Sequence, residues 1–273
     1  MAGQAISDAK RAHPALEWVV LPELFTSAYS GLAHVQQYAE PALDGESARF
    51  FSALARELGV HIAYGFPEQL PIGGVSDSVN LVGPDEPGVL LTYRKRHLVR
   101  TTGEDLVFVP GAELPVIEAG GMRVALVVCW DLGFPEVVRE AALTGAELIL
   151  APAGWREPWG YQYALSCAAR ALDNAVYLAS ANQVGVYPEA VFGSSGGVYG
   201  PDGSRVCDGV EVSGGVPGGV LRVAEVDRGF PERWRSFYGD TVLERRGMSL
   251  EGSRDHRPWT SRYGQVGLTL TGK

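Results

Sequence analysis

The stretch Val124-Ala-Leu-Val-Val-Cys129-Trp-Asp-Leu-Gly-Phe-Pro135-Glu136 decides the fold class of this chain. Its first five residues, 124–128, are apolar and rich in β-branched valine, which predicts a strand buried on both faces. The run stops at Cys129. Pro135 followed by Glu136 indicates the first turn of a helix, because proline lacks only a backbone donor that is surplus there. A buried strand that turns sharply into a helix is typical of an α/β sheet.

Cys129 allows two interpretations. At a turn between strand and helix it would face unpaired backbone N–H groups and the positive end of the helix dipole, and both favour the thiolate. Alternatively it only continues the apolar strand, since free cysteine is among the most buried residue types. The rest of the chain favours the reactive interpretation.

Composition narrows the class of protein. The chain has 273 residues, of which 46% are hydrophobic, so it can bury a substantial core and is not disordered as a whole. A net charge of −9 argues against nucleic acid or an anionic membrane as the main partner. The three cysteines, Cys129, Cys167 and Cys207, form no C-x-x-C pair and fit a reducing compartment. With no signal pattern and no apolar run of membrane-spanning length, we predict a cytoplasmic protein.

Strands and helices interleave along the chain. We predict helices at 6–16, 46–58, 134–144 and 161–173, with Phe50, Leu54 and Leu58 on the buried face of the second helix and Gly59 ending it. We predict strands at 18–21, 61–66, 78–82, 89–93, 148–151, 176–181, 191–198, 204–206 and 220–226. Residues 209–219 are expected to form a glycine-rich loop, and the tail from Asp227 is polar. Without a linker or a repeat, the economical prediction is one α/β domain over residues 1–273.

Charged residues stand where two of these strands end. Glu23 follows the strand at 18–21, a position where open α/β sheets place functional groups, although it could also be a solvated loop charge. The run Tyr93-Arg-Lys95-Arg-His97-Leu98 follows the strand at 89–93. Such a run is usually a solvated face, yet a residue directly after a strand can point into a cleft.

Cysteine hydrolases need a thiolate, a general base and donors for a tetrahedral oxyanion. None of the histidines is an obvious base for Cys129, and only His97 stays open; the five are His13, His34, His61, His97 and His256. A glutamate and a lysine at strand ends offer another solution. The glutamate would take the thiol proton while the lysine donates to the developing oxyanion.

In this arrangement the sequence resembles the nitrilase superfamily of carbon–nitrogen hydrolases. The resemblance rests on blocks in the family's order: Pro22-Glu-Leu-Phe25, Tyr93–Leu98, Glu104 before Phe108-Val-Pro-Gly111, and Cys129–Glu136. Ala151-Pro-Ala-Gly-Trp155, Arg170-Ala-Leu-Asp-Asn174 and Pro201-Asp-Gly203 extend it over most of the chain.

The resemblance implies an α/β fold, a four-layer α-β-β-α sandwich (nitrilase-like) that commonly forms homodimers or larger homo-oligomers. It implies that Glu23 is the general base, that Lys95 stabilises the oxyanion and that Cys129 is the nucleophile. Glu104 would orient Lys95 or the substrate, and the backbone N–H of Trp130 would be a second oxyanion donor.

Four flanking residues receive supporting roles. By the same likeness Glu136 ties down the turn that presents Cys129, and Arg94, Arg96 and His97 are supports or surface. No cofactor and no metal is implied, and the chain has no H-E-x-x-H, ligand-spaced Cys/His cluster or Walker-type loop.

The expected reaction is hydrolysis of a small amide to an acid and ammonia through a thioester on Cys129, with water as the second substrate. Cys129–Glu136 looks more like the amidase and carbamoylase branches than like nitrilases, and N-carbamoyl compounds or nitriles remain alternatives. Tyr29, Trp155, Phe192 and Trp159 are either pocket walls that suit an apolar acyl group or ordinary packing. Gly133 stands where related sequences often carry a larger or cationic residue, which disfavours carboxylate-bearing substrates.

One departure and two competing interpretations remain. Family members usually begin with an extra apolar strand, and residues 1–4 offer none, so we expect either that the sequence starts late or that another segment covers that sheet edge. Residues 193–197 match G-x-S-x-G, but a serine nucleophile elbow needs a helix after it and a turn follows instead. An inactive oligomeric binding or scaffold protein is the alternative from another class.

Overall fold

The computed structural model describes residues 2–27, 32–85, 87–187, 190–194, 196–207 and 220–238. Tyr29, Ser195 and the expected loop at 209–219 lie outside the described residues.

The first sheet has four strands in the order β1-β2-β3-β4. They are β1 (Trp18–Val20), β2 (His61–Gln69), β3 (Val75–Val82) and β4 (Val89–Arg94). β1 runs parallel to β2, whereas β2, β3 and β4 are antiparallel neighbours. Strand β2 is buried on both faces: Ile62, Tyr64 and Phe66 pack toward the helices, while Ala63 packs into the core between the sheets. Among the described strands, β1 forms the edge of this sheet.

The second sheet has five strands in the order β11-β8-β7-β6-β5. They are β5 (Val116–Ala119), β6 (Met122–Leu126), β7 (Leu148–Ala153), β8 (Tyr177–Asn182) and β11 (Gly196–Tyr199). The central strands β6, β7 and β8 are parallel, which explains their continuous apolar sequences. A separate antiparallel pair is formed by β9 (Gly185–Tyr187) and β10 (Ala190–Phe192).

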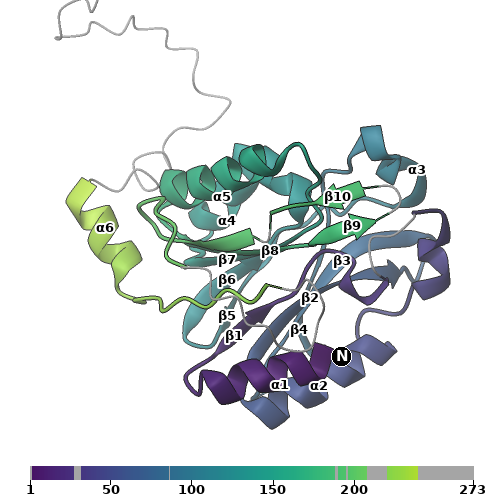
Figure 1. Ribbon diagram of the computed structural model, residues 1–273, viewed down its shortest axis with the longest axis horizontal. Helices are drawn as coiled ribbons and strands as arrows, with labels where there is room; N and C mark the ends of the chain where they lie inside the picture. Colours follow the sequence, from purple (N-terminus) through teal and green to yellow (C-terminus); the bar gives the residue numbers. More distant parts are fainter. Residues whose placement is uncertain are drawn as a thin grey trace, which may run out of the picture.

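Helices cover the outer face of each sheet (Figure 1). α1 (Ala2–Ala12) and α2 (Glu46–Leu58) lie against the first sheet, and α4 (Pro135–Leu143) and α5 (Gly160–Asn174) lie against the second. Side chains of both sheets meet in one core, which includes Val79 and Leu81 from β3 and Ile149 and Leu150 from β7. The α-β-β-α sandwich is therefore confirmed.

Short helical segments connect these layers and carry much of the site described below. They are η1 (Phe25–Ser27), η2 (Leu32–Tyr38), η3 (Arg100–Thr102), α3 (Glu104–Val107) and η4 (Cys129–Gly133). In the described part of the chain, no helix is both long and apolar enough to cross a membrane.

The prediction for 46–58 is confirmed in its bounds, and Gly59 caps α2 with a left-handed φ of 64°. On the predicted face of this helix, Leu54 is buried and Leu58 packs against the core, but Phe50 was wrong. Phe51 and Ala55 are buried, whereas Phe50 is 48% exposed. The sequence interpretation followed the large residues, but the contacting stripe of α2 is completed by small ones, Ala48 and Ala55, which allow the helix to approach the sheet.

Two predictions near the C-terminal end were wrong. Residues 220–226 form no strand, and 191–198 is not one strand, because residues 193–195 separate β10 from β11. The polar tail nevertheless contains α6 (Phe230–Tyr238), whose first residue packs against the core beside Tyr177. The turn predicted at 199–203 is confirmed by the hydrogen bond from the Gly200 N–H to the Ser204 carbonyl, at 2.8 Å.

Candidate active site

Glu23 lies in the turn that follows β1, and the backbone of this turn contacts β2. The Gly65 N–H on β2 donates to the Pro22 carbonyl at 3.3 Å, and the Gln183 side chain donates to the Glu23 carbonyl at 3.0 Å. The side chain of Glu23 is completely buried, and the next residue, Leu24, has a positive φ of 47°. The two sheets together thus fix the backbone of this glutamate.

Lys95 is the residue directly after β4, and the antiparallel register places it opposite Asp77. Ser78 pairs with Arg94 in the ladder, and the next position is closed by the Lys95 N–H, which donates to the Asp77 carbonyl at 2.8 Å. The following loop returns over this strand end, where the Gly111 N–H donates to the Lys95 carbonyl at 2.9 Å. A Cβ on Gly111 would stand 2.3 Å from the Arg94 carbonyl oxygen, so only glycine permits this approach.

The ammonium of Lys95 joins the two glutamates named from the sequence. Its Nζ donates to Glu23 Oε1 at 2.6 Å and to Glu104 Oε2 at 2.7 Å, and all three side chains have no solvent exposure. Glu104 is the first residue of α3, and its Oε2 also accepts the Val99 N–H at 2.9 Å. Burial alone would lower the pKa of Lys95, yet Glu23, Glu104, Cys129 and Asp77 together raise it well above its usual value.

Asp77 completes this cluster and was missed by the sequence interpretation. Its Oδ2 lies 3.5 Å from Lys95 Nζ, and its side chain is fully buried. Burial raises the pKa of the Asp77 carboxyl well above its usual value; Glu23 and Glu104 raise it further, and Lys95 opposes them. The predicted strand at 78–82 began one residue too late to include it.

Cys129 is the first residue of η4, and it stands between β6 and α4 rather than at the start of α4. Its φ is 46°, a conformation that costs an ordinary residue roughly 1–2 kcal/mol. Among the described residues only Leu24, Cys129 and Ala175 combine a side chain with positive φ, and the first two flank this site. Strained backbone of this kind clusters at functional positions.

The expectation that the turn favours a thiolate was wrong. Cys129 is only 5% exposed, and burial raises its thiol pKa well above the usual value. Glu23 and Glu104 raise this pKa further, while Lys95 and the Gly154 N–H lower it. The resting group is therefore a thiol, because desolvation outweighs the nearby backbone donors.

The turn that presents Cys129 is held by Asp131. Its Oδ2 accepts the Val128 N–H at 3.0 Å and the Tyr93 hydroxyl at 2.8 Å, and its Oδ1 accepts the His97 N–H at 3.0 Å. The role expected for Glu136 was wrong: Glu136 is exposed in the first turn of α4. Asp131 does this work because it lies inside the turn, where its carboxylate reaches both strand ends.

The residues that flank Lys95 are supports, as expected. Arg94 donates to both carboxylate oxygens of Glu68, at 2.7 and 2.6 Å, and Arg96 donates to Glu140 at 2.7 Å. The His97 ring lies 2.8 Å from Asp131 Oδ1 and stacks on Phe134 with 3.8 Å between ring centroids. His97 therefore helps Asp131 to anchor the turn that contains Cys129, and its ring nitrogen Nδ1 faces Asp131.

The aromatic residues proposed as pocket walls have different surroundings. Trp155 is buried and its ring lies 5.3 Å from that of Trp130, the residue after Cys129. Phe192 packs in a small cluster with Leu24, the residue after Glu23. Trp159 is 54% exposed at the start of α5. Asn182 was also missed: its side chain accepts the Trp155 N–H at 2.6 Å and donates to the Trp155 carbonyl at 3.0 Å, which fixes this tryptophan.

The G-x-S-x-G match has the wrong context for a nucleophile elbow. It runs directly into strand β11, which pairs with β8, and no helix follows.

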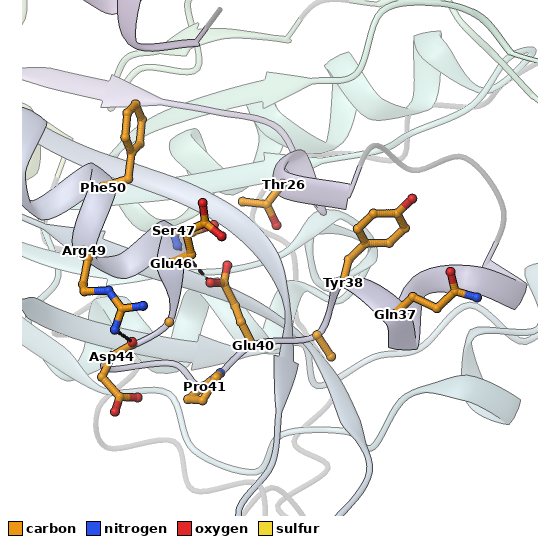
Figure 2. A pocket seen from close by; sticks show the side chains of 12 residues that line it. Thr26, Gln37, Tyr38, Glu40, Pro41, Asp44, Glu46, Ser47, Arg49 and Phe50 are labelled. Atoms are coloured by element: carbon orange, nitrogen blue, oxygen red, sulfur yellow. Dashed lines mark hydrogen bonds between the residues drawn. The ribbon is translucent and has the colours of Figure 1, made fainter.

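A hollow of about 660 Å³ lies apart from the buried cluster, between η1, η2 and the start of α2 (Figure 2). Carboxylates of Glu40, Asp44 and Glu46 line it together with Arg49. Glu40 accepts the Ser47 N–H at 2.9 Å, so this donor in the first turn of α2 is already used. The hollow contains none of the residues around Lys95, and within the described ranges no trio of His, Cys, Asp or Glu is arranged to hold a metal ion.

Comparisons with known proteins identify the family of this chain. The family model for carbon–nitrogen hydrolases matches residues 2–236, so the chain belongs to this family. A 2-oxoglutaramate amidase of Bacillus subtilis is 31% identical over 212 residues, covering 77% of each chain. The resemblance to the nitrilase superfamily, first seen in the sequence blocks, is confirmed.

Two solved structures share the fold. Nit3 of Saccharomyces cerevisiae, a nitrilase superfamily member, superposes with a TM-score of 0.76 at 23% identity, covering 87% of this chain and 86% of that one. A variant of the amidase from Nesterenkonia sp. AN1, with acrylamide added to its active-site cysteine, superposes with a TM-score of 0.68 at 27% identity, covering 88% and 91%.

Proposed function

We propose that this chain hydrolyses a small non-peptide amide to a carboxylic acid and ammonia through a thioester on Cys129. The observation that carries the proposal is the buried cluster in which Lys95 donates to Glu23 and Glu104, with the Cys129 thiol in its field. A cation buried between two carboxylates needs excellent geometry to repay its desolvation. This cluster is therefore better explained by chemistry than by stability.

Each group has a distinct role in the proposed cycle. Glu23 takes the thiol proton as Cys129 attacks the amide carbonyl carbon, so the thiolate forms only during the attack. Lys95 and the backbone N–H of Trp130 stabilise the oxyanion, the latter because the first N–H groups of a helix lack acceptors within that helix. Glu104 holds Lys95 in place from the opposite side to Glu23.

The remaining steps reuse the same base. The protonated Glu23 returns its proton to the departing nitrogen, so ammonia leaves and the thioester remains on sulfur. Glu23 then activates a water molecule, whose attack on the thioester carbonyl releases the acid and restores the Cys129 thiol. One carboxylate can serve both halves because water attacks the thioester from the place that the leaving nitrogen has vacated, where Glu23 has just delivered its proton.

Several relatives are named for amide hydrolysis, which supports an amide as the first candidate, although others are named nitrilases. The Bacillus subtilis relative is named for 2-oxoglutaramate, and the Nesterenkonia neighbour is named an amidase. Trp155 and Phe192 flank the nucleophile and the base, respectively, and we propose them as walls for an apolar part of the acyl group. N-carbamoyl compounds and nitriles are the alternative substrates.

The deciding experiment measures ammonia release and the mass of the enzyme together. The wild-type chain and Cys129→Ala would be mixed with a panel of amides, N-carbamoyl amines and nitriles that includes 2-oxoglutaramate. Samples quenched in acid within one turnover would be weighed intact. We expect ammonia from one class of substrate, and an added acyl mass on the wild type that Cys129→Ala lacks.

Other outcomes point elsewhere. A carbamoyl mass would favour the carbamoylase alternative. No ammonia from any compound, together with a Cys129 that iodoacetamide does not alkylate, would favour an inactive binding or scaffold protein.

A homodimer is the assembly we propose. Tyr161, Leu165 and Leu172 are 78%, 54% and 47% exposed, and they share one face of α5 by their helical spacing. Leu165→Asp should yield a monomer by light scattering, whereas Leu43→Asp, at a 71% exposed position before α2, should not change the mass. A monomeric wild type would contradict this proposal.

A further inference from the structure

Three carboxyl groups surround the single ammonium of Lys95, and all four side chains have no solvent exposure. Glu23 and Glu104 each accept a hydrogen bond from Nζ, whereas Asp77 Oδ2 stands farther away, at 3.5 Å. If all three carboxyl groups were ionised, the buried cluster would carry an excess of negative charge. A buried charge must be paired and hydrogen-bonded, or the group keeps its proton instead.

The two buried aspartates of the described chain differ in one respect. Asp131 accepts hydrogen bonds from the Tyr93 hydroxyl and from the backbone N–H groups of Val128 and His97. Neither oxygen of Asp77 has a donor. Backbone and hydroxyl donors are what compensates a buried carboxylate, so Asp77 lacks the environment that Asp131 possesses.

Glu23 also has a buried oxygen that lacks a hydrogen-bond donor. Its Oε1 accepts from Lys95, but its buried Oε2 has no donor. Asp77 Oδ2 and Glu23 Oε1 lie 3.5 and 2.6 Å from the same Lys95 Nζ, so the two carboxyl groups are neighbours. Their interaction is among the causes that raise the pKa of Asp77. A single proton on Asp77 satisfies both side chains at once, because Asp77 becomes a donor and Oε2 of Glu23 becomes its acceptor.

We propose that Asp77 is a positioning residue that keeps its proton in the resting enzyme and donates it in a hydrogen bond to Glu23 Oε2. Glu23 is then held at both oxygens, by Lys95 on one and by Asp77 on the other, and it remains the base for Cys129. Each carboxylate oxygen has a second lone pair, so the bond from Asp77 leaves room for the thiol proton.

The charges that face Asp77 agree with this assignment. Glu23 comes from the turn after β1, Glu104 from α3 and Lys95 from the end of β4. Burial and both glutamates raise the pKa of Asp77, and only Lys95 lowers it. An ionised Asp77 would add a negative charge near Cys129 and oppose formation of the thiolate during attack. The neutral form of Asp77 avoids this repulsion.

The first test reads the proton directly and does not depend on turnover. Wild-type protein labelled with carbon-13 at the aspartate carboxyl would be examined by infrared spectroscopy at neutral pH. We expect an isotope-shifted C=O band of a protonated carboxylic acid, which disappears in Asp77→Asn and persists in Asp44→Asn, an exposed control. Absence of the band in the wild type, or its persistence in Asp77→Asn, would overturn the inference. The wild-type measurement decides by itself if the variant does not fold.

The second test rests on the proposed function. The amide of Asp77→Asn is uncharged and can still donate to Glu23, so kcat should stay within about threefold of wild type. Asp77→Ala removes the donor, and kcat should fall by about tenfold or more, as expected for a lost hydrogen bond to a charged group. Equal losses in both variants would refute the positioning role. A wild type that hydrolyses no amide would instead count against the proposed function, while the infrared band would still judge the proton.

Discussion

The backbone of Glu23 lies directly on Gly65. A Cβ at Gly65 would stand 2.8 Å from the Cα of Glu23 and 2.5 Å from the nitrogen of Leu24, closer than real Cβ atoms approach backbone. The missing side chain on β2 is therefore what allows the turn after β1 to sink between the sheets. A glycine of the first sheet in this way sets the position of the proposed base.

Gly65→Ala should damage catalysis more than stability. The methyl group meets backbone atoms that cannot rotate away, so the turn must lift and Glu23 must leave its place beside Lys95. We expect kcat/KM to fall by about a hundredfold, because displacing a reacting group by roughly 1 Å has this effect. Kinetics with circular dichroism to establish folding would check it.

Gly133→Ala is the matched control on the other side of the site. The nearest atoms to a Cβ there belong to the Trp130 ring at 3.5 Å, an ordinary contact. If Gly133→Ala lost as much activity as Gly65→Ala, the loss would reflect a general sensitivity of the site to substitution and not a displacement of Glu23.

The sequence predicted the sandwich and the cluster of Glu23, Lys95 and Glu104 through its resemblance to the nitrilase superfamily, because each of these residues stands in a local block that carries the resemblance. It missed Asp77 and the need for Gly65, because both depend on pairing between strands. Asp77 faces Lys95 only through the register of β3 with β4, and a strand begun at 78 excludes it.

The protonation state of Cys129 was also predicted wrongly. The turn at Cys129 suggested a thiolate because only its backbone donors were considered. The thiol pKa is instead raised by burial and by Glu23 and Glu104, which are distant from Cys129 in the sequence. Local sequence contains no measure of desolvation, so it cannot decide between competing effects on a pKa.

Lys95→Ala should abolish turnover. The variant loses the proposed oxyanion donor, and loss of one such donor in other hydrolases costs on the order of 10²–10³ in rate. It also leaves buried carboxyl groups without their cation, so we expect a loss of about 3–5 kcal/mol in the free energy of unfolding. Urea unfolding and kcat/KM with the amide found above would measure both.

Arg96→Ala provides the neighbouring control. Arg96 pairs with Glu140 at the surface, where the side chains are 24% and 48% exposed, and such pairs contribute roughly 0–1 kcal/mol. Near-normal turnover in Lys95→Ala would contradict the role given to Lys95, and a large loss in Arg96→Ala would mean that the whole run matters.

Asp131→Ala should loosen the nucleophile turn, and Glu136→Ala should not. Removing Asp131 leaves the Val128 and His97 N–H groups and the Tyr93 hydroxyl without their acceptor, at about 1–3 kcal/mol for each buried group. The exposed Glu136 should change the free energy of unfolding by less than about 0.5 kcal/mol. Comparable destabilisation of both variants in urea would show that the anchor has been assigned to the wrong acid.

The alkylation of Cys129 should continue to rise with pH beyond the range of an ordinary thiol. Burial and Glu23 raise its pKa above the usual value near 9, so the thiolate fraction of the folded chain is still increasing where that of an unfolded chain has levelled off. Iodoacetamide rates from pH 7 to 10, read by intact mass, would follow this. Cys129→Ala corrects for Cys167, whose pKa burial raises to about 12, and for Cys207. A rate that levels near neutral pH would indicate a stabilised thiolate.

The stability of the wild type should decrease with rising pH in a way that Asp77→Asn does not share. The pKa of Asp77 is raised on folding, so above pH 3.8 the unfolded chain releases this proton while the folded chain retains it. The unfolded state then binds fewer protons, and the free energy of unfolding falls by at most about 1.4 kcal/mol per pH unit until the folded pKa is reached.

Asparagine does not titrate. The free energy of unfolding of Asp77→Asn, relative to that of the wild type, should therefore increase steadily as the pH rises from 4 toward 7. Urea unfolding across this range measures the difference, and Asp44→Asn, where the side chain is exposed, should give a difference that does not change with pH. If Asp77→Asn instead loses stability relative to the wild type as the pH rises, Asp77 is ionised in the folded protein. The excess negative charge around Lys95 would then be neutralised at Glu23 or Glu104 instead.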